Sequence, residues 1–445
     1  MEKLRRTILE PARETPVLAE TDVLVAGGGP AGVAAAIAAA RNSARALIVE
    51  NRECLGGMAT SGMMNRLGPY HDEQKMIVGG IPREVLQRLI AMNAAIAPVP
   101  CPHTEPDRYW IPFDPEALKH VLDLMVREAR VEVLFQTHVV SVVQENGRLV
   151  GVVVESKSGR HAILAKMIID ATGDGDVAAL AGAPYEKGRP EDGLMQPMTL
   201  LYKVHNVDRD RVKAALAAHK NEIFERAKAQ GDAIPRYVGP GTDNLLRSDE
   251  TYYNVDHVHS ADGTSVRDLS RAVMEARDLI WQSVTFARKH VPGYERSYLC
   301  ATASNLGVRE SRRISGEYVL TGDDVLAGRK FADAVARYAC WIDIHTVAPG
   351  KDKGHYASKG LAPGNYYEIP YRSLVPKRVE NLLVAGRCFS ATHEAFASAR
   401  MIPCCMAMGQ AAGTAAALAV EGNTPPRALD VARLQSALRR QGAMV

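Results

Sequence analysis

Cysteines are few in this chain, and none shows the spacing of a metal or disulfide motif. The seven cysteines are odd in number and scattered over 445 residues, and no CxxC pair occurs. This pattern disfavours a disulfide framework, a zinc site and an iron–sulfur cluster, so we expect no metal. Such thiols are typical of a reducing compartment, and the sequence therefore predicts a cytoplasmic protein.

Neither sign of charge is in large excess, since 54 Lys and Arg residues stand against 51 Asp and Glu residues. A net charge of +3 gives no reason to expect a nucleic acid or an anionic membrane as a partner. Long apolar runs are missing too. The N-terminus, MEKLRRTILE, lacks the apolar region of a secretory signal, and the stretch 404–420 is too short and small-sided to span a bilayer.

The overall composition is that of an ordinary globular protein, with 47% apolar and 24% charged residues. A chain of this length exceeds one typical domain. We therefore expect two domains that share an active site where they meet.

What the chain does contain is a characteristic unit over residues 21–50, TDVLVAGGGPAGVAAAIAAARNSARALIVE. The apolar run 23–26 is typical of a parallel strand buried on both faces. Gly27, Gly29 and Gly32 then fit the pattern GxGxxG. In this pattern the first glycine permits a tight turn, the second lets a pyrophosphate approach the backbone, and the third lets helix and strand pack closely.

An alanine-rich helix over 31–41 follows the turn, and its free N-terminal amides can bind phosphate. Asn42 is expected to end this helix in the left-handed conformation. A second strand over 46–49 ends at Glu50, about 20 residues beyond the turn, where a carboxylate accepts hydrogen bonds from an adenosine ribose. A 2′-phosphate would favour Arg there, so the sequence predicts a dinucleotide of the FAD or NAD kind.

The middle of the chain predicts more elements of the same domain. Apolar spacing indicates a helix over 82–95, and Asp114 is placed to cap a helix over 115–129. Alternating apolar residues, with Asn146-Gly147 as a hairpin turn, predict strands over 131–135, 137–145, 148–156 and 161–170.

The later part of the chain differs in texture. A charged helix is expected over 270–289, within a region that we assign to the substrate domain. Near the C-terminus the opening pattern returns in shorter form. Residues 382–385 predict a buried strand, Gly386 a tight turn, and Pro403 the first position of a helix that contains GQAAG.

Three segments together resemble the two-domain flavoproteins with a glutathione-reductase-type FAD fold: DVLVAGGGPAG…LIVE, IIDATGDGD and LLVAGRCFSATHEAFASAR…GQAAG. The chain is more closely similar to the FAD-dependent oxidoreductase family, on the motifs GGMAT and GVRESRRISGEYVLTGDD. Residues 398–413 are also similar to the flavin clamp of fumarate-reductase-like proteins. Some relatives that resemble heterodisulfide reductase subunits carry iron–sulfur motifs, which this sequence lacks. The resemblance covers nearly the whole chain and implies FAD as the cofactor.

The expected fold class is α/β, with a Rossmann-like three-layer FAD/NAD(P)-binding domain and an inserted α+β substrate domain. Residues 1–20 are expected to form an N-terminal extension, and 66–112 a substrate-side helix and crossing. The substrate domain is expected over 190–370, and the FAD-binding domain over 21–65, 113–189 and 371–445.

The resemblance also implies specific FAD contacts. The glycine turn would hold the pyrophosphate, Glu50 the ribose, and the backbone of Val139 or Val140 the adenine. The amides of Met401 and Ile402, at the start of a helix, would stabilise the reduced flavin at its N1/O2 edge. The full predicted set is Gly27, Gly29, Pro30, Ala31, Gly32, Glu50, Asn51, Gly56, Gly57, Met58, Ala59, Thr60, Val139, Val140, Ala171, Thr172, Gly173, Asp174, Gly386, Arg387, Met401 and Ile402.

Four residues are candidates for the chemistry. His393 and Arg400 precede the helix that is expected to face the flavin, so we predict His393 as acid or base and Arg400 as anion holder. Arg309 and Arg312 lie in an expected turn-to-helix stretch, with Arg309 and Arg313 on one helical face.

Arg309 and Arg312 are predicted to recognise a carboxylate or another anion. For the arginines the structural alternative is salt bridges with Glu310, Glu317 or FAD phosphates, and for His393 it is a buried structural histidine. His71, His345 and His355 have weaker claims, because nothing local places them near the ring.

The predicted function is hydride transfer between flavin N5 and a small polar substrate, with an anionic group as the option that the arginines favour. Two alternatives stay open: an electron-transfer flavoprotein subunit resembling heterodisulfide reductase components, and a non-catalytic FAD-binding module. The sequence also leaves open the substrate, the direction of the reaction, the electron acceptor or donor, covalent attachment of FAD, and any homo-oligomeric assembly.

Overall fold

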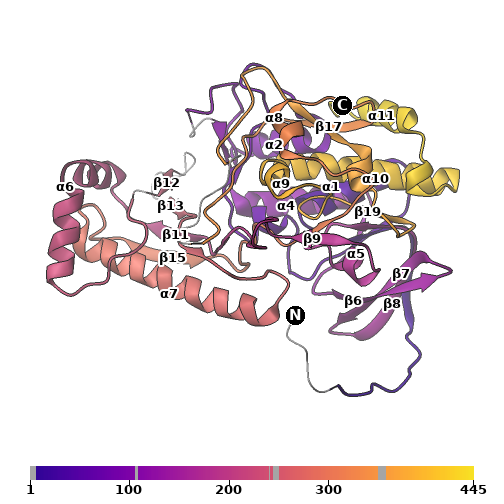
Figure 1. Cartoon of the computed structure of the whole chain (residues 1–445), viewed down its shortest axis with the longest axis horizontal. Helices are drawn as coiled ribbons and strands as arrows, with labels where there is room; N and C mark the ends of the chain where they lie inside the picture. The colour runs from indigo at the N-terminus through magenta and orange to yellow at the C-terminus, as the bar shows by residue number, and fades with distance from the viewer. Residues whose placement is uncertain (1–6, 106–108, 240, 244–249, 349–356) are drawn as a thin grey trace.

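The computed structural model describes residues 7–105, 109–239, 241–243, 250–348 and 357–445. Its apolar side chains gather into two cores. In Figure 1 the first core lies within the large body that holds both the early and the late helices, and the second lies in the lobe that carries α6 (Arg209–Ala229) and α7 (Val266–His290).

A seven-stranded sheet forms the centre of the large body. Its parallel part runs in the order β5 (Glu132–Leu134), β2 (Ala46–Val49), β1 (Val17–Ala26), β8 (Gly159–Asp170), with β19 (Leu382–Val384) beside the end of β8. The first half of β8 pairs antiparallel with β7 (Arg148–Ser156), which pairs with β6 (His138–Glu145). One strand therefore belongs both to a buried parallel sheet and to an antiparallel ribbon, which in Figure 1 projects below the helices.

Most predicted elements of this body are present. The helix after the glycine turn is α1 (Pro30–Arg41), and the Asp114 side chain caps α4 (Pro115–Glu128) as expected. The hairpin between β6 and β7 turns at Asn146 and Gly147, which both have positive φ angles of 49° and 79°. Such angles are those that a two-residue hairpin turn needs.

Three local predictions were wrong in detail. Asn42 follows α1 with φ −102°, and the left-handed residue is Ser43, with φ 66°. The helix predicted over 82–95 is α2 (Gly80–Ala91), and Pro403 is the second residue of α10 (Ile402–Gly422). The rule that Asn prefers the left-handed region is statistical, and here the next residue takes the sharp turn.

The helices α1 and α10 pack directly on each other because both carry small residues on the facing side. A Cβ atom at Gly409 would lie 2.0 Å from the carbonyl oxygen of Ala31, and one at Gly413 would lie 2.0 Å from that of Ala35. These contacts leave no room for any side chain at the two glycines. They bring the start of α10 beside the glycine turn, although the two segments are almost 400 residues apart in sequence.

Among the described residues, α10 is the one helix long and apolar enough to cross a membrane. In this structure 89% of its most apolar window is buried inside the protein. Its apolar side chains therefore belong to the core between α1 and the sheet.

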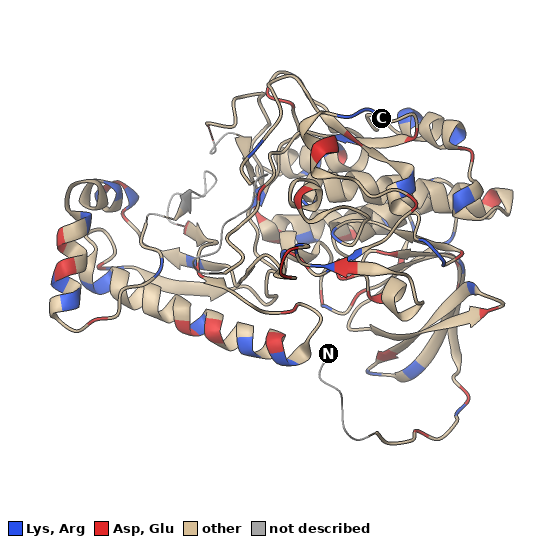
Figure 2. Cartoon of the chain, viewed as in Figure 1, with Lys and Arg blue, Asp and Glu red and all other residues tan. Residues whose placement is uncertain are grey.

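The second core lies between helices and a four-stranded antiparallel sheet. The strands are β12 (Thr242–Asp243), β13 (Glu250–Tyr253), β11 (Tyr202–His205) and β15 (Tyr298–Thr302), in that order. The helices α6 and α7 flank these strands. Figure 2 shows that acidic and basic residues are interspersed along both helices. The shorter pair β10 (Met198–Thr199) and β14 (His257–Val258) is antiparallel and contributes Met198 and Val258 to this second core.

The two cores do not divide at the predicted domain boundary of residue 370. Buried apolar residues from Met198 to Leu306 form the second core, whereas those from Ile314 to Leu374 belong to the first. The side chains of Met58, Met63 and Met64 also pack on the second core. The six predicted segments stay a prediction, and the packing adds that the loop after β2 touches both cores.

The remaining elements are short. The paired strands are β3 (Arg66–Leu67) with β4 (Ile111–Pro112), β9 (Tyr185–Lys187) with β16 (Arg312–Ile314), and β17 (Ala334–Tyr338) with β18 (Tyr367–Pro370). The remaining helices are α5 (Asp176–Leu180), α8 (Gly322–Leu326), α9 (His393–Ala399), α11 (Val431–Arg440) and three short turns of 3₁₀-helix, η1 (Gly57–Ala59), η2 (Tyr371–Leu374) and η3 (Pro426–Ala428).

Candidate functional site

The turn between β1 and α1 is closed at its first and third glycines and open at its second. A Cβ atom at Gly27, where φ is +96°, would lie 2.6 Å from the carbonyl oxygen of Ala171 and 2.9 Å from the Cα of Thr172. A Cβ at Gly32 would lie 1.8 Å from the carbonyl oxygen of Gly27. At Gly29, by contrast, a Cβ would meet no heavy atom within 4 Å. No side chain caps the first amides of α1 in the described structure, so they are available to an anion in this opening.

Glu50 ends β2 beside this opening. Its buried carboxylate accepts hydrogen bonds from the amide of Gly28 at 2.6 Å and from that of Arg52 at 2.8 Å. Asn51 follows on the surface. The acidic side chain is therefore fixed in orientation by two backbone donors, at the position that the sequence predicts for a ribose.

The start of β6 lies next to Glu50. The amide of Thr137 donates to the Glu50 carbonyl oxygen at 3.0 Å. Val139 follows two residues later, and Val140 is exposed at an irregularity of the β6–β7 pairing. The structure thus brings the predicted adenine segment to the predicted ribose residue, while the adenine contact itself stays a prediction.

The loop after β2 covers the other side of the opening. Gly56 and Gly57 both have positive φ angles, 98° and 51°, which glycine adopts readily. A Cβ at Gly57 would lie 3.2 Å from the Cα of Gly29 and 3.6 Å from the Pro30 ring. The two glycines therefore let this loop approach the start of α1 closely.

The next three residues of the loop have different surroundings. Ala59 and Thr60 are buried, and the Thr60 hydroxyl donates to the carbonyl oxygen of Leu55 at 2.5 Å. Their side chains thus hold the loop in shape. Met58 is half-buried and packs toward the second core, so it is the side chain of this loop that reaches the predicted substrate side.

The turn after β8 and the turn after β19 meet at the same place. The Arg387 guanidinium donates to the Asp174 carboxylate at 2.9 Å and lies against Gly173, whose Cβ would be 2.7 Å from Arg387 Nη2. Among the described residues, Arg387 Nη1 is buried without a hydrogen-bond partner. A Cβ at Gly386 would lie 3.0 Å from the Cβ of Ala31 in α1. The turn after β19 therefore packs on the start of α1, while the Arg387 guanidinium lies at the turn after β8.

A second group of polar residues surrounds Arg309. Its side chain is buried, with 7% of the residue exposed. Its guanidinium donates to the Pro197 carbonyl oxygen at 2.8 Å, the Thr199 hydroxyl at 2.6 Å and the Asn254 amide oxygen at 3.1 Å. All three acceptors are neutral, and among the described residues no carboxylate lies within salt-bridge distance of Arg309.

Arg400 stands beside this group and is paired. It donates to the Asp343 carboxylate at 3.0 Å and to the Asp343 carbonyl oxygen at 3.2 Å, while its Nε is buried and has no partner in the described part of the chain. The Asp343 carboxylate also lies 3.4 Å from Nε2 of His345. The side chains of Asp343 and His345 each keep 29% of their surface exposed, so this side of the group is accessible to solvent.

Two histidines connect the arginines. His345 Nδ1 lies 3.2 Å from His257 Nε2, and His257 Nδ1 lies 2.8 Å from the Thr199 hydroxyl, which also accepts from Arg309. We call Arg309, Thr199, His257, His345, Asp343 and Arg400 the arginine–histidine centre.

Burial and the two guanidinium charges control titration in this centre. Burial and the charge of Arg400 lower the pKa of Arg309 to about 9. Burial and the charge of Arg309 lower the pKa of His257 to about 2 and that of His345 to about 4, so both imidazoles are neutral at pH 7. Burial raises the pKa of Asp343, but the hydrogen bond from His345 and the Arg400 charge outweigh it and hold that pKa well below its usual range.

The arginine–histidine centre touches both predicted cofactor segments. A Cβ at Gly307 would lie 2.8 Å from the Thr199 carbonyl oxygen and 3.1 Å from the terminal methyl group of Met58. On the other side, Arg400 directly precedes Met401, which is the N-cap of α10. The centre therefore lies between the loop after β2 and the start of α10.

The other two predicted catalytic residues lie apart from this centre. Arg312 donates to the Asp174 carbonyl oxygen at 2.9 Å and to Asp176 at 2.8 Å. It belongs to strand β16, so the prediction that this stretch is helical was wrong. The stretch forms a strand because it pairs antiparallel with β9, and the local spacing of residues does not predict this pairing.

His393 is buried at the start of α9. Its Nδ1 lies 2.9 Å from the Glu310 carboxylate, which also accepts from Arg313 and, at 3.0 Å, from the amide of Gln196. Its Nε2 is buried, and no described residue forms a hydrogen bond with it. Its role as acid or base stays a prediction.

A sequence model of the family described as FAD dependent oxidoreductase matches residues 22–438. The chain belongs to the FAD-dependent oxidoreductase family. No protein among those with curated functions matches this chain.

Solved structures of low similarity include a geranylgeranyl bacteriochlorophyll reductase-like protein from Thermoplasma acidophilum, 14% identical, with 96% of this chain and 84% of that chain covered at a TM-score of 0.43. A flavin-dependent brominase is 12% identical over 95% and 83% of the two chains, with a TM-score of 0.43. The p-nitrophenol 4-monooxygenase of Pseudomonas putida is 12% identical over 67% and 70%, with a TM-score of 0.34. Scores this low add nothing about the substrate or reaction of this FAD-dependent oxidoreductase.

The first group of residues fits FAD. The open position at Gly29 and the uncapped amides of α1 suit a pyrophosphate. Beside Gly173, another predicted cofactor residue, Arg387 Nη1 is a buried donor without a partner among the described residues. Glu50 would hold the ribose, and the start of α10 would face the flavin. When bound, FAD supplies a two-electron acceptor or donor that exchanges hydride at N5.

Sequence reasoning named Arg309 and Arg400 but neither Thr199 nor Asp343, and it did not select the two histidines of the arginine–histidine centre. His257 was not singled out, and His345 was ranked below His393. Both come from segments without a local motif, and a bridging hydrogen bond across 88 residues joins them. No spacing in the sequence could have paired them. His355, the third histidine with a weaker claim, lies outside the described residues.

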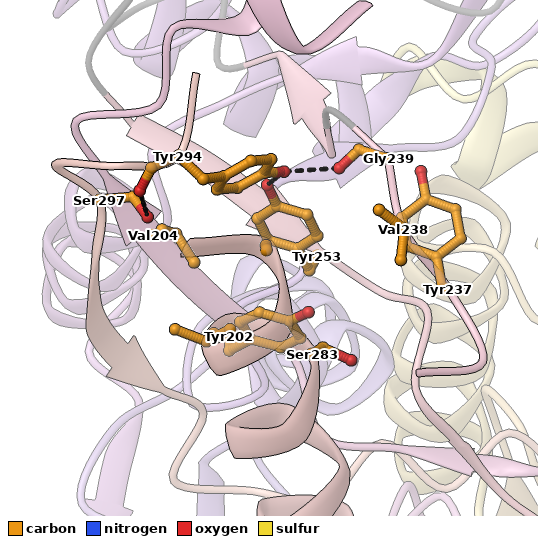
Figure 3. A pocket seen from close by; sticks show the side chains of 11 residues that line it. Tyr202, Val204, Tyr237, Val238, Gly239, Tyr253, Ser283, Tyr294 and Ser297 are labelled. Carbon is orange, nitrogen blue, oxygen red and sulfur yellow. Dashed lines mark hydrogen bonds between the residues drawn. The ribbon is translucent and has the colours of Figure 1, made fainter. Parts of the chain in front are cut away.

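A small pocket in the second core is separate from this centre. Figure 3 shows that tyrosine rings surround it, with Tyr202 stacked on Tyr253 at 4.8 Å between ring centroids. The Tyr253 and Tyr294 hydroxyls bond to each other at 2.5 Å, and Tyr294 also donates to the Gly239 carbonyl oxygen at 2.6 Å. Because these hydroxyls already have protein partners, the cavity is part of the packing between α7 and its sheet.

Proposed function

We propose that this FAD-dependent oxidoreductase acts on a small, polar, anionic substrate that binds at the arginine–histidine centre. The observation that supports this proposal best is the state of Arg309. Its guanidinium is buried, and its three hydrogen-bond acceptors are neutral. A buried charge is costly unless an opposite charge compensates it.

One bound anion would balance the charges of the centre. The two guanidiniums of Arg309 and Arg400 stand against a single carboxylate, that of Asp343, and both histidines are neutral at pH 7. One positive charge is thus uncompensated. A substrate with one carboxylate or a similar group would neutralise it and could also use the unpaired Nε of Arg400.

The chain's own residues would then bind and orient the substrate. Arg309 is held rigidly by Thr199, Asn254 and the Pro197 carbonyl, so its position is set before the substrate arrives. Asp343 fixes Arg400 in the same way. A preorganised pair of donors costs little reorganisation on binding and places the rest of the substrate between Met58 and the start of α10.

The test uses trifluoroacetate, a monoanion at all working pH values, and its neutral amide, added to the FAD-loaded protein. Calorimetry and the visible spectrum of FAD report binding. We expect trifluoroacetate to bind and the amide to bind much more weakly. The variant Arg309→Gln should weaken anion binding at least about tenfold, or ~1.4 kcal/mol.

Arg433→Gln is the matched control, because Arg433 forms an exposed pair with Glu421 far from the centre in sequence. It should bind trifluoroacetate as the parent does. A parent protein that ignores trifluoroacetate, or an Arg309→Gln variant with parental affinity, would contradict the proposal.

Three further points belong to the proposal. Electrons pass between the substrate and a donor or acceptor outside the chain, which the sequence does not identify. Assembly into homo-oligomers stays an open expectation. A cytoplasmic location is supported by the seven cysteines, all of which are free thiols in the structure.

A further inference from the structure

The hydrogen bonds of the arginine–histidine centre run in one direction. The Asp343 carboxylate can only accept, so His345 donates to it from Nε2. A neutral His345 then accepts at Nδ1 from His257 Nε2. A neutral His257 in turn accepts at Nδ1 from the Thr199 hydroxyl, whose oxygen accepts from Arg309. The contacts therefore fix the tautomers of both imidazoles.

We propose that His257 and His345 form a proton-accepting pair that takes up one proton when an anion binds between Arg309 and Arg400. The proposal rests on the proposed function, because it requires an anion at this centre. It assigns the handling of a proton to these two histidines.

Geometry provides the first reason. If His345 gains a proton at Nδ1, it becomes a donor to His257 Nε2. The proton on His257 must then move to Nδ1, where it is donated to the Thr199 oxygen. The Thr199 oxygen would then accept from His257 as well as from Arg309 at 2.6 Å. Its own hydroxyl hydrogen would no longer point to His257 and would be free to form a hydrogen bond to an anion bound at Arg309. One proton enters, the hydrogen bonds from His345 through His257 to Thr199 reverse their direction, and the anion gains a hydrogen-bond donor.

Charge provides the second reason. The groups that face the pair are Arg309, Arg400, Asp343, His259 and Arg236, whose guanidinium donates to the His257 carbonyl oxygen at 2.8 Å. His259 is itself held neutral by burial, which lowers its pKa. Three guanidiniums therefore oppose a charge on the pair, and one carboxylate favours it. The negative charge of a bound anion would offset the charge of one guanidinium and raise the pKa of the histidine pair, so that an imidazolium could form.

The sign of the pH dependence follows from these charges. Without an anion, the pKa of His345 is about 4. With an anion, that pKa should rise toward the ordinary histidine value of about 6.5. Between these values, proton uptake accompanies binding, so the affinity for a monoanion should fall about sevenfold from pH 5 to pH 6.

The experiment measures proton uptake by calorimetry of the FAD-loaded protein with trifluoroacetate at pH 5.5, in two buffers that differ in ionisation enthalpy. The parent should take up close to one proton for each anion. In His345→Gln the amide can still donate to Asp343 and accept from His257, but it cannot gain a proton. This variant should show almost no uptake and less than a twofold change in Kd between pH 5 and pH 6, and His257→Gln, which keeps His345 but removes the second imidazole, should take up less than the parent.

His290→Gln is the matched control. His290 is also a buried histidine beside a carboxylate, with its Nε2 2.9 Å from Asp232, but it belongs to the end of α7 in the second core. Its variant should take up as many protons as the parent. The ratio of FAD absorbance to protein and the melting temperature show whether each variant is folded.

The outcomes separate the two proposals. If trifluoroacetate does not bind to the parent, both fail. If it binds without proton uptake, or if both glutamine variants keep the uptake, the paired role of His257 and His345 is wrong and the anionic substrate stands. Nitrogen-15 spectra of the unmutated protein decide the case in which a variant does not fold, since an imidazolium signal should appear when trifluoroacetate is added.

Discussion

The open position at Gly29 gives the sharpest test of the cofactor site. The change is Gly29→Ala, which adds one methyl group where the structure has no heavy atom within 4 Å. Gly29 has φ −67° and ψ −176°, which any residue can adopt, so no backbone strain is expected. The methyl group would stand in the space that the FAD pyrophosphate needs.

The expected magnitudes differ between the folded chain and its cofactor. Gly29 is the N-cap of α1, and alanine at an N-cap costs no more than about 1 kcal/mol of stability. A displaced pyrophosphate loses at least one charge-assisted hydrogen bond to an α1 amide, worth about 1.5–3 kcal/mol. The Kd for FAD should therefore rise roughly 10- to 150-fold.

The assay is titration of apoprotein with FAD, followed by flavin fluorescence, together with the melting temperature of the apoprotein. Gly32→Ala is the contrasting variant, because its Cβ would lie 1.8 Å from the Gly27 carbonyl oxygen and should disrupt the turn itself. If Gly29→Ala binds FAD with parental affinity and stoichiometry, the pyrophosphate does not lie at this turn.

Two further predictions concern the packing and charge that hold the site in place. Gly409→Ala should cost about 1–3 kcal/mol in chemical denaturation, because its Cβ would lie 2.0 Å from the Ala31 carbonyl oxygen. Gly422→Ala, whose Cβ would meet its nearest atom at 3.5 Å, should change stability by less than about 1 kcal/mol, and equal effects would refute the packing argument. Asp343→Asn should cost about 1.5–3 kcal/mol at pH 7. Since the folded protein lowers the pKa of Asp343, its contribution is present above the ordinary value of about 3.9 and is lost as the pH falls below it. Melting curves of parent and variant should therefore converge below about pH 4, and a constant difference would count against the ion pair.

The dinucleotide-binding unit was predictable from the amino-acid sequence alone. Strand, glycine turn, helix and terminal acid over residues 21–50 are contiguous, and each is specified by its own side chains or by their absence. The hairpin at Asn146-Gly147 and the cap at Asp114 were predictable for the same reason. The local patterns left FAD or NAD open, and the family and FAD were implied by the resemblance of several segments to known flavoproteins, which the family model confirms.

The membership of the arginine–histidine centre, by contrast, depends on how distant segments pack together. Thr199, His257, Arg309, His345 and Arg400 come from five separate segments, and their hydrogen bonds span up to 110 residues. Secondary-structure periodicity relates only residues that are close in sequence, so it could not bring these side chains together or separate Arg312 from Arg309. The packing of the second core against the loop after β2 places them in one buried site. Burial also gives the site its chemistry, since the same guanidiniums and imidazoles in water would be independent and unshifted.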